Sequence, residues 1–169
     1  MKKRIFQCLA WLLVILWMGL IFSFSGQTAE VSGKISSSTT AKIIAKIYPG
    51  FDSLSPDEQA EIIDTAEHLV RKIAHLCEYF ILSALLVFAL LFNNFLPTNR
   101  AILAVLISLV YAATDEIHQL FVSGRACRLS DILIDTCGAA IFAALYLLVV
   151  KLFNKKIKIH SHNDMHPKS

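Results

Sequence analysis

Four long apolar segments constrain this chain more than any other feature of its sequence. Each is long enough to cross a hydrocarbon layer about 30 Å thick as a single helix. They are residues 5–24, 76–96, 101–120 and 132–150. The hydrophobic content of 56% and the charged content of 17% lie outside the range of ordinary soluble domains. The sequence therefore predicts an all-α membrane protein, a four-helix transmembrane bundle with little room for a separate soluble domain.

Basic residues flank these segments on one side of the predicted membrane. They precede the first span, lie between the second and third, and follow the fourth: Lys2, Lys3, Arg4, Arg100, Lys151, Lys155, Lys156 and Lys158. The positive-inside rule makes that side cytoplasmic. We therefore expect a multi-pass protein of the cell membrane with both termini in the cytoplasm and with loops 25–75 and 121–131 facing outward. The net charge of +3 then reflects topology and gives no indication of nucleic-acid binding.

The first outward loop carries two helical patterns. Between Thr28 and Tyr48, apolar residues recur at loosely helical spacing with lysines on another side, which predicts an amphipathic helix on the outer surface. The run Ser55-Pro56-Asp57-Glu58 combines a capping hydroxyl, a proline at the first helical position and a glutamate three residues after the cap. A second outer helix should begin at Pro56. The sequence leaves open whether it continues into the second span.

Ionisable and amide groups collect at the outer ends of three spans. The list is Arg71, His75, Glu78, Asp115, His118, Gln119, Arg125, Arg128, Asp131 and Asp135. Within each span these residues are three or four positions apart and share a helix face. Counting about 1.5 Å per residue from the cytoplasmic ends places the histidine, glutamate and aspartate members of this list about 22 to 33 Å up, near the outer surface. We expect them to meet in one pocket whose formal charges nearly balance.

The pocket residues admit functional and structural interpretations. His75 or His118 would act as a base with Glu78 and Asp115 as partners, or the same groups would form an interhelical network that fixes packing. Arg125 and Arg128, with Arg71 and Gln119, would bind a phosphate or carboxylate headgroup, or the arginines would only pair with the acids. Asp131 and Asp135 would seat a divalent cation, although no recognised metal spacing is present.

The four cysteines give no further site. Cys8, Cys77, Cys127 and Cys137 lack the paired spacing of a zinc site. A disulfide from Cys127 to Cys77 or to Cys137 is geometrically open, whereas small buried or inert thiols are the favoured interpretation.

At the polar residues the sequence resembles the VanZ-like family of bacterial membrane proteins. The matching pieces are Phe22-Ser23-Phe24-Ser25-x-Gln27, Arg71-Lys72-x-x-His75-x-x-Glu78-Tyr79-x-x-Leu82, Tyr111-Ala112-x-x-Asp115-Glu116-x-His118-Gln119-x-Phe121-Val122-x-Gly124-Arg125 and Asp131-x-x-x-Asp135-Thr136-x-Gly138. The resemblance implies a transmembrane domain over residues 1–153, followed by a cytoplasmic polar tail over 154–169. It also implies an envelope protein linked to glycopeptide, teicoplanin-type, antibiotic resistance, without supplying a reaction.

Two functional classes follow from this resemblance and from the polar cluster. The first is an enzyme that acts at the membrane face on an anionic lipid or a cell-wall-linked substrate. The second is a non-catalytic headgroup-binding or envelope-modifying protein whose polar cluster is structural. The sequence leaves open the substrate, the use of a divalent cation and the oligomeric state.

Overall fold

The computed structural model describes residues 2–165, with side chains described through Lys156. The helices are α1 (Lys2–Ser25), α2 (Ala29–Ile47), a short 3-10 helix η1 (Phe51–Ser53), α3 (Pro56–Leu90), α4 (Pro97–Gln119) and α5 (Leu129–Met165). No strand occurs in this part of the chain. Helices α1, α3, α4 and the Leu129–Lys156 part of α5 are long and apolar enough to cross a membrane. The predicted all-α fold with four spanning helices is confirmed.

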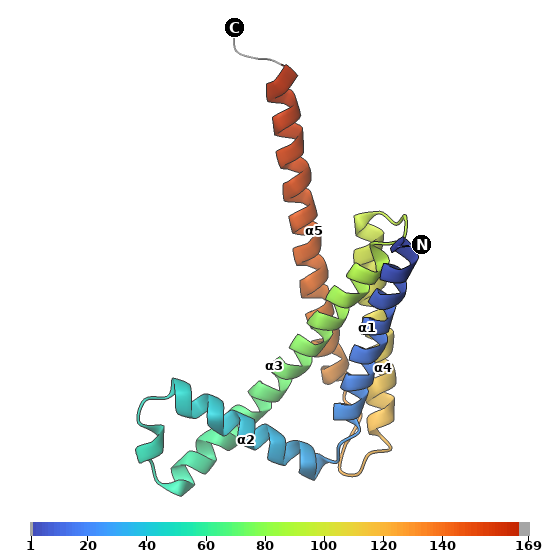
Figure 1. Cartoon of the computed structure of the whole chain (residues 1–169). Coiled ribbons are helices and arrows are strands. Elements are labelled where there is room, and N and C mark those ends of the chain that lie inside the picture. Colours follow the sequence, from blue (N-terminus) through green and yellow to red (C-terminus); the bar gives the residue numbers. More distant parts are fainter. Residues whose placement is uncertain (1, 166–169) are drawn as a thin grey trace.

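The two ends of the bundle differ in what they carry. Figure 1 shows the N-terminus and the α3–α4 connection at one end, with α5 extending beyond it. The α1–α2 and α4–α5 connections lie at the opposite end, which we call the polar end because the ionisable residues gather there. Helix α2 and the first half of α3 lie side by side and project from the bundle as an arm (Figure 1).

Helix α3 is unbroken for 35 residues, which settles the question that the sequence left open. Its start is fixed by the predicted capping box, in which the Ser55 hydroxyl accepts from the Glu58 N–H and the Glu58 carboxylate accepts from the Ser55 N–H. One rigid helix therefore carries both the arm and the second span. On the arm, the Ser37 hydroxyl of α2 donates to the Glu67 carboxylate of α3 at 2.6 Å.

The second span ends earlier than its apolar sequence indicated. We expected it to continue to Leu96, but α3 ends at Leu90. Asn93 breaks the helix, because its N–H donates to the Leu90 carbonyl and its side-chain oxygen accepts from the Gln7 amide at 3.2 Å. Pro97 then opens α4 at its first turn, where the missing N–H does no harm.

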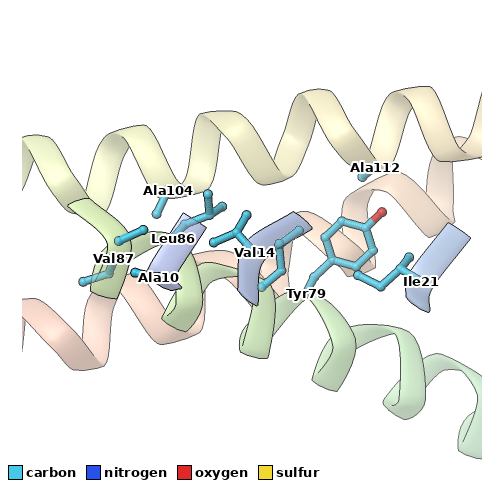
Figure 2. Close-up of a cluster of buried hydrophobic side chains, with 10 residues drawn as sticks. Ala10, Val14, Ile21, Tyr79, Leu86, Val87, Ala104 and Ala112 are labelled. Carbon is cyan, nitrogen blue, oxygen red and sulfur yellow. The ribbon is translucent and has the colours of Figure 1, made fainter. Parts of the chain in front are cut away.

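The bundle core is built from large residues of α3 against small residues of α4. Figure 2 shows Tyr79, Leu86 and Val87 of α3 together with Ala104 and Ala112 of α4. Small side chains at every third or fourth position of α4 let the two helices approach closely. Helix α1 covers this core with Ala10, Val14 and Ile21.

Helix α1 is held at its edge by two side-chain hydrogen bonds to helix backbone. The Tyr111 hydroxyl donates to the Met18 carbonyl at 2.6 Å, and the Trp17 indole donates to the Glu78 carbonyl at 3.0 Å. Most of its remaining large side chains, including Ile15 and Leu16, are exposed and would face lipid.

Helices α3 and α5 touch backbone to backbone at Gly138. A Cβ atom on this buried glycine would overlap the carbonyl oxygen of Leu76. One turn further along, the Phe80 and Phe142 rings meet edge to face at a centroid distance of 5.2 Å. The contact at Leu76 brings its neighbour His75 level with Asp135, which lies one turn before Gly138.

Helix α5 continues without a break past residue 153, where the polar tail was predicted to begin. The side chains of residues 157–169 lie outside the described part of the chain, so the polar tail stays a prediction.

Candidate functional site

The close approach of α3 and α5 pairs His75 with Asp135. The distance from His75 Nδ1 to Asp135 Oδ1 is 3.5 Å, and the distance from the same nitrogen to Glu78 Oε2 is 3.9 Å. The Asp135 side chain is 2% exposed, whereas the His75 side chain is 23% exposed. The two groups are close enough for an ion pair when the imidazole is charged, although His75 Nδ1 and Asp135 Oδ1 make no hydrogen bond among the described residues.

A first cavity at the polar end, of about 130 Å³, is rich in cations. It lies between the start of α2, α3, the α4–α5 loop and the first turns of α5. Its polar lining, which defines what we call the cationic cavity, is His68, Arg71, Lys72, His75, Gln119, Arg125, Arg128 and Asp131. Four residues with a formal positive charge and one carboxylate line it, and only Arg71 of the four forms a salt bridge, with Glu67, among the described residues; this space therefore favours an anion.

A second cavity, of about 240 Å³, adjoins the first on the side of α1 and α2. Hydroxyl groups and two carboxylates line it, and these residues define what we call the hydroxyl cavity: Ser25, Ser32, Ser36, Thr39, Glu78 and Asp115. Ile21, Phe24, Ile35 and Val70 add apolar walls. Arg71, His75 and Arg125 line both cavities and form the boundary between them.

Four buried polar atoms on residues that line the hydroxyl cavity have no hydrogen-bond partner among the described residues: Arg71 Nε and His75 Nδ1 at its boundary, and one atom each of Asp115 and Ser25. Asp115, which is 3% exposed, accepts from the Gln119 amide at 3.4 Å through Oδ2, whereas its Oδ1 is unpartnered. The Ser25 hydroxyl, on a residue 5% exposed, is also unpartnered. Buried polar groups are normally satisfied, so the Asp115 and Ser25 atoms are suited to a bound molecule or to water.

The α4–α5 loop is pinned so that Arg125 reaches this boundary. Gly124 adopts a positive φ of 75° and packs so closely on Ala29 that a Cβ would lie 2.9 Å from the alanine methyl carbon. The Ala29 N–H donates to the Ser123 carbonyl, and Arg125 Nε donates to the Gln27 carbonyl at 3.2 Å. Burial, and secondarily the nearby Arg71 charge, lower the pKa of the Arg125 guanidinium from its usual value.

Glu116 has a structural role that its position beside Asp115 concealed. Its side chain points away from the cavities, is 1% exposed, and accepts the Arg128 N–H at 2.8 Å through Oε2. Arg128 immediately precedes α5, so this bond ties the end of α4 to the start of α5. The Arg128 side chain stays free to line the cationic cavity.

His118 and the two aspartates of α5 do not share one site. The His118 ring stacks on Phe22 at a centroid distance of 4.1 Å and lines neither cavity. Asp131 accepts from the Ser130 hydroxyl and lines the cationic cavity, whereas Asp135 faces His75.

Within the described part of the chain, no group of three or more His, Cys, Asp or Glu side chains is arranged to hold a metal. The cation seat at Asp131 and Asp135 stays a prediction.

Sequence reasoning missed the contribution of α2. Ser32, Ser36 and Thr39 lie on its face toward the hydroxyl cavity, and the predicted site contained no residue of this helix. A signal was present, because hydroxyl residues recur at helical spacing between Ser32 and Thr40. His68, one turn before Lys72 on α3, was also not singled out.

The cysteines are not buried as expected. Cys8, Cys77, Cys127 and Cys137 are all free and exposed on the protein surface. The buried alternative is therefore wrong, the inert-thiol alternative stays a prediction, and neither of the two disulfides that had been left open is present.

Comparison with protein-family models gives a match over most of the chain. The family model described as VanZ/LLP1 matches residues 10–151, which include most of every spanning helix and all residues of both cavities. No curated protein and no solved structure matches the chain. The resemblance predicted from the sequence motifs is confirmed.

Proposed function

This chain belongs to the VanZ/LLP1 family, and we propose that it is a cell-membrane enzyme. It binds an anionic headgroup at its polar end and acts on it. The headgroup belongs to a membrane lipid or to a cell-wall-linked substrate. Through this binding the protein lowers the susceptibility of the cell to teicoplanin-type glycopeptides, as the family name suggests.

One observation carries this proposal. Arg71, His75 and Arg125 separate two cavities of opposite chemistry, so a single bound molecule would touch all three. Arg71 and Arg125 supply donors to an anion, and the His75 ring lies beside it, next to the buried Asp135 carboxylate. His75 is thus the base that we propose for proton transfer, with Glu78 and Asp115 as the acceptors on the hydroxyl side.

A non-catalytic binding protein is the second candidate. It is favoured by Glu116 and His118, because these two ionisable residues are engaged in structural contacts at the same end of the bundle. In that case the site would recognise a headgroup without changing it, and the remaining polar cluster would hold the helices together.

The test is teicoplanin susceptibility of cells that carry His75→Ala or Asp115→Asn, with protein level measured in the same membranes. We expect full loss of protection at unchanged protein level, because His75 is the proposed base and Asp115 supplies the buried, unpartnered carboxylate oxygen of the hydroxyl cavity. Asp64→Asn, an exposed carboxylate on the arm, is the matched control and should behave as wild type. Partial, dose-dependent protection would favour the non-catalytic binder, and loss of the protein itself would indicate a structural network.

The proposed topology places the polar end outside the cell and both termini in the cytoplasm. We expect an impermeant maleimide to label intact cells through the native Cys127, which is exposed in the α4–α5 loop. The other three cysteines are first replaced by serine. The matched comparison is Asn94→Cys in a cysteine-free chain, at an exposed position of the α3–α4 connection, and it should react only after the cells are opened. The reverse pattern would contradict the orientation.

A further inference from the structure

The two cavities are suited to different parts of one ligand. In the cationic cavity, guanidinium and ammonium groups outnumber carboxylates, so this side suits a phosphate or another compact anion. In the hydroxyl cavity the buried Asp115 Oδ1 accepts no hydrogen bond from the described residues, and the Ser25 hydroxyl, which can donate as well as accept, lies close to that carboxylate. Since the same three residues line both spaces, the anionic group and the donor group belong to adjacent positions of one molecule.

The donor in the hydroxyl cavity is better matched by a hydroxyl than by an ammonium group. Glu78 and Asp115 would attract a cation, but the Arg125 guanidinium lines the same cavity and offsets part of their formal charge, and the Arg71 guanidinium, which pairs with Glu67, lines it as well. An ammonium group there would lie beside two guanidinium groups. A neutral hydroxyl donates to the unpartnered carboxylate oxygen without adding charge, and its own oxygen accepts from the serine and threonine hydroxyls.

The walls of this cavity also suit the carbon side of a polyol or sugar. Ile21, Phe24 and Ile35 provide apolar surface opposite the hydroxyl groups of Ser32, Ser36 and Thr39. A mixed lining of this kind contacts C–H groups on one side and hydroxyl groups on the other.

We propose that the two cavities together recognise a phosphate ester whose alcohol part is a polyol or a sugar. The phosphate lies in the cationic cavity against Arg71 and Arg125, and the adjoining hydroxyl groups reach Asp115 and Ser25. This inference rests on the headgroup binding proposed above and names its chemical class. The same chemistry occurs in a lipid headgroup and in a free polyol phosphate.

The experiment titrates the full chain, purified in a neutral detergent, with four probes and measures dissociation constants. The probes are short-chain phosphatidylglycerol, phosphatidic acid, phosphatidylethanolamine and glycerol 3-phosphate. We expect phosphatidylglycerol to bind about tenfold more tightly than phosphatidic acid or phosphatidylethanolamine, the effect of about one hydrogen bond to a charged group. Equally tight binding of glycerol 3-phosphate would support the site and assign it to a soluble compound, whereas weaker binding assigns it to lipid.

Two variants separate the two halves of the ligand. Ser25→Ala should reduce phosphatidylglycerol binding to the level of phosphatidic acid and leave phosphatidic acid binding unchanged. The Arg128 side chain is exposed, and Arg128→Gln keeps the backbone bond to Glu116. This variant should weaken the binding of both lipids by a similar factor. Lys42→Gln, on the exposed side of α2, is the control and should change neither constant.

Equal affinity for phosphatidylglycerol and phosphatidylethanolamine, or for phosphatidylglycerol and phosphatidic acid, would overturn the polyol assignment. If Arg128→Gln still weakened the binding of every lipid, the proposal of headgroup binding itself would stand. Failure of the proposed function has a different signature, namely no saturable binding of any probe together with unchanged teicoplanin susceptibility of the His75→Ala cells.

Discussion

Gly138→Ala is expected to destabilise the folded bundle severely, and Gly138→Leu to prevent its accumulation in the membrane. The added Cβ would overlap the Leu76 carbonyl oxygen, which is helix backbone and cannot rotate away as a side chain would. Overpacking against side chains costs about 1 to 3 kcal/mol, and a backbone clash lies at or above the upper end of that range. Thermal unfolding of the purified protein, with its abundance in membranes, measures the effect.

Gly19→Ala is the matched control for this prediction. Gly19 also lies within a spanning helix, but a Cβ there meets nothing within 4 Å. Alanine favours helix over glycine by about 1 kcal/mol, so this variant should be neutral or slightly more stable. If the Gly138→Ala and Gly19→Ala proteins had the same melting temperature, α3 and α5 would not be in backbone contact. The pairing of His75 with Asp135 would then lose its basis.

Glu116→Ala is expected to detach the α4–α5 loop from the bundle. The carboxylate is 1% exposed and accepts the Arg128 N–H at the start of α5. Its removal leaves that donor without its partner, at a cost of about 1 to 3 kcal/mol. Because the same loop carries Arg125, anion binding in the cationic cavity should weaken together with stability. Faster proteolysis within residues 120–128 and a lower melting temperature would report the change.

Glu116→Gln separates the hydrogen bond from the charge. Its amide oxygen still accepts the Arg128 N–H, so it should restore most of the stability lost in Glu116→Ala. Glu30→Ala removes a carboxylate that is 78% exposed, and it should have little effect. A glutamine variant as unstable as the alanine variant would show that the charge of Glu116, and not this bond, holds the loop.

The spans and helix starts were predictable because strong local signals set them. Uninterrupted apolar sequence located the four spanning helices, and the capping box located Pro56 as the start of α3. The end of α3 was not predictable from hydropathy, because Leu91, Phe92, Phe95 and Leu96 continue the apolar run beyond Leu90. There, a hydrogen bond between Asn93 and Gln7 of a different helix helps to fix the turn. The local sequence pattern does not predict such a contact.

The candidate site was predictable in its membership more than in its arrangement. Residues three or four apart on one helix could be grouped, and His75, Asp115, Asp131 and Arg125 do line two adjoining cavities. The direction in which each helix face points depends on packing. For this reason the stacking of His118 on Phe22, the turn of Glu116 toward Arg128 and the hydroxyl groups supplied by α2 became visible only in the folded chain.

The continuity of α3 restricts how the length of this chain can vary. Glu67, which binds Ser37 on the arm, and His75, which faces Asp135, are joined by helix alone. One inserted residue between them would rotate one partner by about 100° relative to the other and shift it by about 1.5 Å. No loop lies between them that could compensate for this rotation and shift. Insertions are tolerable instead at residues 48–55, which lie outside the α-helices and where a longer connection costs little free energy.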